Sequence, residues 1–245
     1  MRTDPEELER LRRMMADLHP AGPPRARIVQ RAPGGMGVSA GCLGVLDASF
    51  NPMTLAHHGM VEKARRTCGL NEVLLMLSRS NVDKKVFGAD LGQRLAMLLA
   101  YAEGRSDISV AGCSHARFID KAEALRALYV HGTRFYFIVG YDTLQRLFDP
   151  GYYADMQEDL HPLFETSRIV AANRGCHGLE QMRTLMERPE CRPFTDRVDF
   201  IHLAERYTRI SSTRVRQRRR RGEPIRDLVL GEVAEAIEAM GLYLH

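Results

Sequence analysis

The chain has 245 residues, of which 44% are hydrophobic and 27% are charged, and these fractions exclude a disordered, collagen-like or coiled-coil protein. The net charge of +4 is local, because six arginines lie between residues 214 and 221 and leave the rest of the chain slightly acidic. A basic surface spread over one face, as nucleic-acid binding requires, is therefore not expected.

The cysteines and the apolar runs indicate the compartment. The five cysteines are odd in number and lack CxxC spacing, so neither a disulfide scaffold nor a zinc finger is indicated. No apolar run approaches the roughly 20 residues that cross a bilayer, and the acidic N-terminus lacks a signal-peptide pattern. We expect a soluble protein in the cytoplasm or another intracellular compartment.

The first part of the chain differs in composition from the rest. Residues 4–18 carry leucine and methionine at a spacing that predicts an amphipathic helix with acidic residues at its start. Residues 20–41 are rich in proline and glycine and are typical of a linker or a loosely held arm. The sequence therefore predicts an N-terminal extension over residues 1–42 and a single α/β domain over residues 43–245.

From residue 42 onwards, runs typical of strands alternate with helical patterns. The predicted strands cover residues 42–50, 72–78, 107–112, 135–140, 168–173 and 198–203. The predicted helices cover residues 54–68, 90–103, 118–130, 142–160, 178–187, 212–221 and 225–240. Because the strands are almost continuously apolar, the alternation predicts a doubly wound, Rossmann-like parallel sheet. In such sheets, ligands bind beyond the carboxyl ends of the strands.

The first strand-to-helix turn has small and turn-forming residues at 48–52, and the next helix is predicted to begin near Thr54. The N–H groups at a helix N-terminus attract phosphate, and His57, one turn along, points back over the same place. Thr54 and His57 are three residues apart and share a face. From these residues alone, a phosphate site and a capping threonine beside a surface histidine are equally supported.

The letters SFNPMTLAH, which end at His57, resemble the SFNPxTxxH version of the HxGH signature of nucleotidyltransferases. The resemblance is closest to the nicotinamide/nicotinate mononucleotide adenylyltransferases. It implies that His57 and Thr54 act in catalysis and that Ser49 and Phe50 bind ATP, with Ser49 also near the second substrate. One departure is Ala48, where the family usually has glycine, because a side chain there crowds a backbone that must approach phosphate.

The loop after the second strand holds Lys84 and Lys85, two of the four lysines of the chain, as a compact positive charge. The resemblance implies that both contact the phosphates of ATP. It also implies that Arg94, in the following helix, corresponds to an arginine of the family, although an exposed helix arginine needs no special role.

The strand at 135–140 ends in Gly140, and Asp142 follows just before a predicted helix. An aspartate at that place can be a simple N-cap. The resemblance to the GxD segment of the family implies instead that Gly140 and Asp142 lie against the adenosine of ATP. It also makes Arg174, after the next strand, a candidate for binding the substrate.

A helix start with the letters ISSTRVR follows the last predicted strand. Ser212 and Thr213 are natural N-caps that also face an anion, and Arg216 can reach the same anion with its planar fork of donors. Alone, such a helix start is usually solvated surface. Because ISSTxxR is the second hallmark of the family, the resemblance implies that these three residues hold the ATP phosphates, with Arg216 also acting in catalysis. The arginines at 218–221 are interpreted as a solvated face or a contact for an acidic partner.

The chain has no tryptophan, although relatives commonly stack the pyridine ring of the substrate on an indole. Phe118 and Tyr141 are the candidates to replace it, since any aromatic face can stack on a flat ring. Ordinary core packing is the alternative for each of them.

The resemblance spans about residues 43–245 and implies adenylyl transfer from ATP to nicotinamide or nicotinate mononucleotide, with release of pyrophosphate, in NAD biosynthesis. Mg²⁺ is expected to bind through the ATP phosphates, and no metal site on the protein is expected, because the histidines lack metal-ligand spacing. Two alternatives stay open: a related nucleotidyltransferase with another phosphorylated acceptor, and a non-catalytic nucleotide-binding regulator. The expected partners are ATP and a pyridine mononucleotide, with no membrane and no nucleic acid, and a homo-oligomer is left open.

Overall fold

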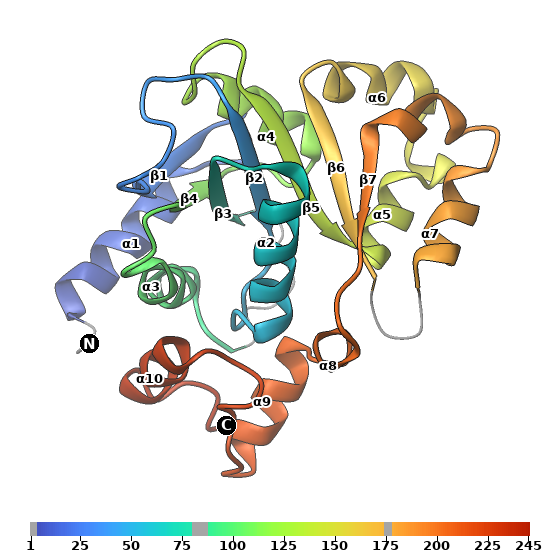
Figure 1. The fold of residues 1–245 in the computed structure, drawn as a ribbon. Helices are drawn as coiled ribbons and strands as arrows, with labels where there is room; N and C mark the ends of the chain where they lie inside the picture. Colours follow the sequence, from blue (N-terminus) through green and yellow to red (C-terminus); the bar gives the residue numbers. More distant parts are fainter. Residues whose placement is uncertain (1–3, 80–87, 174–177) are drawn as a thin grey trace.

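The computed structural model describes residues 4–79, 88–173 and 178–245. Within these residues, seven strands form one sheet in the order β1-β4-β3-β2-β5-β6-β7 (Figure 1). The strands are β1 (Ala26–Gln30), β2 (Cys42–Asp47), β3 (Glu72–Ser78), β4 (Ile108–Cys113), β5 (Arg134–Gly140), β6 (Ser167–Ala172) and β7 (Val198–Ile201). Strands β2 to β7 pair in parallel, and β1 pairs antiparallel with β4. The predicted doubly wound sheet is confirmed.

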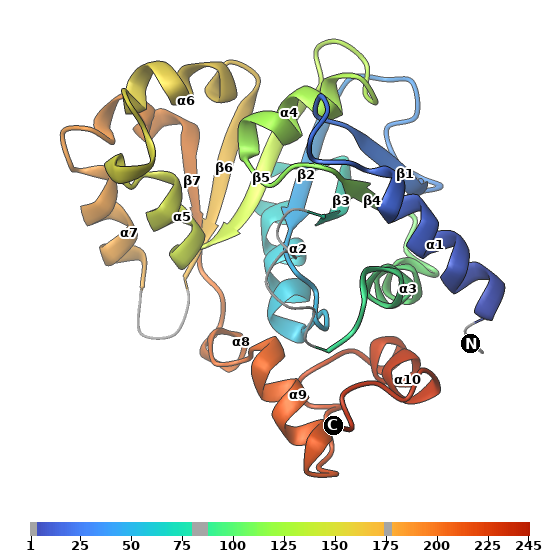
Figure 2. The same ribbon diagram turned by 180° about the vertical axis from the view of Figure 1, so that it is seen from behind.

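Helices cover both faces of the sheet, as Figures 1 and 2 show. They are α1 (Pro5–Asp17), α2 (Leu55–Cys68), α3 (Leu91–Ala102), α4 (Phe118–Arg126), α5 (Tyr141–Leu147), α6 (Met156–Phe164), α7 (Leu179–Met186), α8 (Glu205–Thr208), α9 (Ser212–Arg220) and α10 (Gly231–Ala239). Leu46 on β2 joins the core formed with α1, α2, α3 and α10. Its neighbour Val45 joins the core formed with α4 to α7. Because successive strand residues point to opposite faces, a strand buried on both sides must be continuously apolar.

The N-terminal residues add a helix and a strand to one edge of the sheet. Helix α1 forms where it was predicted, with Asp4 accepting a hydrogen bond from the Glu6 amide at 3.0 Å. Its buried side chains Leu11 and Met15 join the core next to α3 and β4. The interpretation of the following segment as a loosely held arm is wrong for β1, because β1 pairs with β4 and covers what would otherwise be an open sheet edge.

The helix predicted over residues 142–160 is interrupted. Helix α5 ends at Leu147, and a short 3₁₀ turn, η2 (Pro150–Tyr152), separates it from α6. Proline has no amide hydrogen with which to continue a helix, and Asp155 caps a new one by accepting from the first amides of α6. The apolar residues that predicted one long helix therefore belong to two helices, α5 and α6.

The helix predicted over residues 225–240 begins only at Gly231, as α10. Ile225, Leu228 and Val229 lie in the irregular segment that precedes α10, and their side chains are buried in the core. Their spacing fits a helical pattern, although the segment that carries them is not an α-helix.

The carboxyl end of β2 and the N-terminus of α2 lie at the edge of the sheet where α8, α9 and α10 gather (Figures 1 and 2). The register pairs Leu46 of β2 with Ile138 of β5, so these two central strands end at the same edge. In the part of the chain that the structure describes, no helix is long and apolar enough to span a membrane.

Candidate active site

The β2–α2 turn (residues 48–54) carries the first predicted motif. Ser49 is exposed, whereas the next residues turn inward and Phe50 is fully buried with a φ of 41°. The left-handed region is sterically unfavourable for a bulky side chain, so it persists only where the surroundings enforce it. Ala48, the departure from the family pattern, is partly buried and packs against the core.

His57 lies in the first turn of α2 and is oriented by Thr54. The Nδ1 atom of His57 accepts a hydrogen bond from the Thr54 amide at 3.0 Å, and the Thr54 hydroxyl lies 2.9 Å from the same atom. A nitrogen that accepts in a neutral imidazole leaves the ring proton on the other nitrogen, so this contact assigns the proton to Nε2. Thr54 is fully buried, and the centres of the Phe50 and His57 rings lie 5.3 Å apart. The fold therefore places a histidine with a fixed tautomer at the N-terminus of α2.

The second predicted motif lies directly against this turn. The Ser212 hydroxyl donates to the carbonyl of Pro52 at 2.7 Å. Arg216 donates from Nη1 to the carbonyl of Asn51 at 2.6 Å and from Nη2 to the Thr213 hydroxyl at 3.2 Å. Two segments that are about 160 residues apart in sequence thus meet, and both carry motifs for which the resemblance implies contact with ATP.

A second arginine reaches the turn from α3. Arg94 is 4% exposed, and its Nε donates to the carbonyl of Ala89 at 2.8 Å while Nη1 lies 3.3 Å from the carbonyl of Ser49. Burial lowers the pKa of both Arg94 and Arg216, but a guanidinium stays charged in a protein. Two positive charges and a helix N-terminus therefore face one turn, an arrangement that favours an anion.

A buried ion pair supports the turn from the opposite side. Asp47, the last residue of β2, lies 2.6 Å from the ammonium of Lys121 on α4 and accepts from the Ser78 hydroxyl at 2.6 Å. The Lys121 side chain is 1% exposed and also contacts the carbonyl of Ala116 and the ring of Phe118. Sequence reasoning missed this pair. Its only signals were an aspartate at the end of an apolar strand and a lysine within a mostly buried helix.

The residues expected near the adenosine lie where β5 ends. Gly140 closes β5 and precedes α5 as its N-cap. Asp142 is exposed and is not the N-cap, because α5 begins at Tyr141 and Asp142 lies within its first turn. Because β5 neighbours β2, both residues lie on the same edge of the sheet as the β2–α2 turn.

The two aromatic candidates differ in exposure. Tyr141 is 6% exposed and belongs to the core. Phe118, the first residue of α4, is only partly buried and packs edge-on against Phe137 with ring centres 5.2 Å apart. Of the two residues, Phe118 is the more exposed.

Three predicted site residues, Lys84, Lys85 and Arg174, lie outside the described residues. Thr213 is exposed at the start of α9. Within the described ranges, no three His, Cys, Asp or Glu side chains are grouped so that they could hold a metal ion.

The chain is similar to known nucleotidyltransferases. The cytidylyltransferase-like family matches residues 45–218. A Schizosaccharomyces pombe protein that carries the name of a nicotinamide mononucleotide adenylyltransferase is 37% identical over 138 residues, or 55% of this chain and 54% of that protein. The aligned part thus spans about half the length of that relative. A Syntrophotalea carbinolica protein named as a nicotinate-nucleotide adenylyltransferase is 30% identical over 219 residues, or 82% of this chain and 96% of that protein.

A solved structure is similar in fold. It is the nicotinic acid mononucleotide adenylyltransferase of Plasmodium falciparum complexed with APC. The two structures superimpose with a TM-score of 0.60 at 16% identity, over 82% of this chain and 96% of the other. At this identity the superposition shows a shared fold.

Proposed function

The chain belongs to the cytidylyltransferase-like family, among its nicotinate- and nicotinamide-nucleotide adenylyltransferases, and from this premise we propose its reaction. It transfers the adenylyl group of ATP to the 5′-phosphate of a pyridine mononucleotide. The products are the dinucleotide and pyrophosphate. The observation that carries the proposal is the meeting of His57 and Arg216 at the β2–α2 turn, where the imidazole packs on Phe50 and the guanidinium binds the carbonyl of Asn51.

The proposed chemistry is an in-line displacement at the α-phosphorus of ATP. An oxygen of the mononucleotide phosphate forms a bond to that phosphorus, and the bond to the bridging oxygen of pyrophosphate breaks. His57 donates its Nε2 hydrogen to an α-phosphate oxygen, where negative charge increases in the transition state. Thr54 keeps Nδ1 occupied and so holds the imidazole in the donating tautomer. No protein atom becomes covalently bound, and catalysis consists of positioning and charge stabilisation.

The remaining predicted residues take binding roles in this proposal. Ser212, Thr213 and Arg216 hold the β- and γ-phosphates at the N-terminus of α9, together with Lys84 and Lys85. Support for the first three is their position against the β2–α2 turn.

In this proposal, the adenine of ATP and the pyridine ring of the mononucleotide lie along the carboxyl ends of the strands. Gly140 and Asp142 contact the adenosine, because they lie at the carboxyl end of β5, the strand next to β2. Phe118 stacks on the pyridine ring, and Arg174 contacts the mononucleotide. Ser49, exposed at the start of the turn, lies between the two substrates.

Mg²⁺ enters with the nucleotide in this proposal. The described residues offer no carboxylate cage, and Mg²⁺ commonly binds through substrate phosphates and water. When bound, the ion would neutralise phosphate charge, while Arg94 and Arg216 supply the positive charge that belongs to the protein.

The test is an assay of the purified chain with ATP, Mg²⁺ and either nicotinate or nicotinamide mononucleotide, with dinucleotide and pyrophosphate measured together. We expect equal amounts of both products, and the two kcat/KM values give the preference between acid and amide. EDTA should abolish turnover, and added Mg²⁺ should restore it. Pyrophosphate release with only another phosphorylated acceptor would replace the proposal by a related transferase. Binding of ATP without any product would indicate a regulator.

A further inference from the structure

The C-terminal end of the chain reaches the candidate active site. After α10, the Leu242 amide donates to the carbonyl of Ile237 at 3.0 Å, and the chain then turns inward. Tyr243 is 6% exposed and has a φ of 63°. A bulky side chain in the left-handed region carries a steric cost that the surrounding structure must offset. The contacts around Tyr243 therefore hold it in a conformation that it would not adopt readily by itself.

The contacts of Tyr243 lead to the β2–α2 turn. Its hydroxyl donates to Oδ1 of Asn51 at 2.9 Å, and the same oxygen accepts from the Ala89 amide at 3.2 Å. The main-chain carbonyl of Asn51 accepts from Arg216. One residue of the turn is thus held by the C-terminus, by the segment before α3 and by α9.

The packing around this contact leaves little freedom. A Cβ added at Gly88 would lie 2.8 Å from Oδ1 of Asn51 and 3.0 Å from Cε1 of Tyr243. Gly88 has a φ of 88°, which only glycine adopts readily. Burial raises the pKa of the Tyr243 hydroxyl, so it keeps its proton and acts as a donor at neutral pH. The hydroxyl of Tyr243 and the Ala89 amide therefore restrict the orientation of the Asn51 amide within a confined space.

We propose that Tyr243 is a positioning residue for adenylyl transfer, because its hydroxyl holds Asn51 and thereby the carbonyl that orients Arg216. The role rests on the proposed function of the same site. Without the hydroxyl, Oδ1 loses the donor that links it to the C-terminal segment, and the peptide carrying the Asn51 carbonyl gains freedom. Arg216 then meets the ATP phosphates less accurately in the transition state.

The test is Tyr243→Phe, which removes one oxygen and keeps the ring. We expect kcat/KM for ATP to fall about tenfold, through a higher KM for ATP and a lower kcat, because a displaced Arg216 binds the phosphates less well in the ground state and still less well in the transition state. KM for the mononucleotide should stay unchanged. The matched control is Tyr129→Phe, which removes a buried hydroxyl that donates to Glu72 at 2.7 Å, at the amino end of β3 and away from the turn. That control should lower Tm and leave the kinetic constants unchanged.

Two outcomes would overturn the proposal. The first is a Tyr243→Phe enzyme with a lowered Tm and unchanged kcat and KM, because the hydroxyl would then serve stability alone. The second is an equal loss of activity in Tyr129→Phe, which would show a general effect of destabilisation. If the wild-type chain forms no dinucleotide, the proposed function fails separately. The positioning role is then measured as ATP affinity by calorimetry, where Tyr243→Phe must weaken binding and Tyr129→Phe must not.

Discussion

The β2–α2 turn is held from two sides by different means. On the arginine side, Arg94 and Arg216 donate to main-chain carbonyls of Ser49 and Asn51. On the lysine side, Lys121 forms a buried ion pair with Asp47. A carbonyl is neutral, so the arginine side retains positive charge next to the helix N-terminus, whereas the lysine side neutralises its charge internally.

The difference in charge indicates that the lysine side serves stability and that the arginine side serves ligand binding. A buried ion pair leaves an uncompensated charge when one partner is removed, so it is costly to break. Arginines that donate to neutral carbonyls keep their net positive charge, and its electrostatic field can act on an anionic substrate. We therefore expect substitutions on the lysine side to lower stability and those on the arginine side to lower activity.

The largest expected effect is that of Lys121→Met. Removing the ammonium leaves the Asp47 carboxylate buried without its cation, and the free energy of unfolding should fall by about 3–5 kcal/mol, measured by urea denaturation. Arg10→Ala is the control, because both side chains of its ion pair with Glu7 are at least 40% exposed and the pair should contribute less than about 1 kcal/mol. Equal losses in the two variants would contradict the assignment of stability to the lysine side.

The double variant Asp47→Asn/Lys121→Met sharpens this prediction. It removes both charges, so part of the lost stability should return if the single variant suffers from an unpaired carboxylate. No recovery would mean that packing of the lysine stem, rather than its charge, supports the turn.

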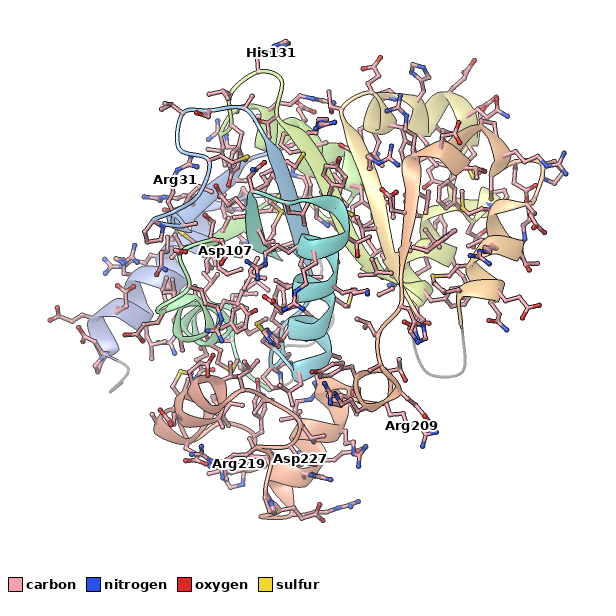
Figure 3. All side chains as sticks on the ribbon, viewed as in Figure 1. Arg31, Asp107, His131, Arg209, Arg219 and Asp227 are labelled. Atoms are coloured by element: carbon pink, nitrogen blue, oxygen red, sulfur yellow. The ribbon has the colours of Figure 1, made fainter. Side chains whose placement is uncertain are left out.

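His57 lies on the turn that both sides hold, and His57→Ala should reduce kcat by on the order of 10² or more while leaving the fold intact. The expected loss corresponds to one preorganised donor in the transition state. His131→Ala is the control, since Figure 3 shows His131 at the opposite end of the molecule from Arg219 of α9. Undiminished turnover of His57→Ala would remove the imidazole from the mechanism.

Arg216→Lys tests the arginine side while keeping its charge. A lysine cannot reproduce the contacts of the guanidinium with the Asn51 carbonyl and the Thr213 hydroxyl at once. We expect kcat/KM for ATP to fall by on the order of tenfold, the effect of about one charge-assisted hydrogen bond, with little change in stability. Arg214→Lys, exposed on the same helix, should retain wild-type kinetics. A loss of stability without a loss of activity would reverse the proposed division between the two sides.

The sequence predicted the arginine side better than the lysine side, and the reason is local. Each predicted phosphate motif is a short segment in which a helix start, a capping hydroxyl and a histidine or arginine lie within a few residues, so the sequence alone singled out His57 and Arg216 as candidates. The pair of Asp47 and Lys121 joins positions 74 residues apart, and no local pattern connects them. The contact of Tyr243 with the turn spans 192 residues and was missed for the same reason.

Sequence patterns also gave little information on exposure. Tyr141 was a candidate for stacking on the substrate, but it follows Gly140 and lies in the core. Asp142 was considered as a helix cap, but the helix begins one residue earlier and leaves it exposed. Element types were predictable from hydrophobic periodicity, whereas a shift of one residue at a boundary decides which way a side chain points.

The smallest expected effect is that of Arg12→Ala, a residue that is linked to the arginine side only through α3. Arg12 on α1 lies 2.9 Å from Asp90, which caps α3 by accepting from the Gln93 amide, and α3 carries Arg94. Both side chains of this ion pair are more than a third exposed, so its loss should lower stability by about 0.2–1 kcal/mol and leave kcat and KM unchanged.

Asp90→Ala provides the comparison for that substitution, because it removes the same ion pair together with the helix cap, which is worth a further ~1 kcal/mol. If Arg12→Ala lowers kcat/KM for ATP as strongly as Arg216→Lys does, the N-terminal helix must influence the turn through α3. The arginine side would then extend from α9 to α1, and its effect on activity would no longer be confined to the residues that contact the turn.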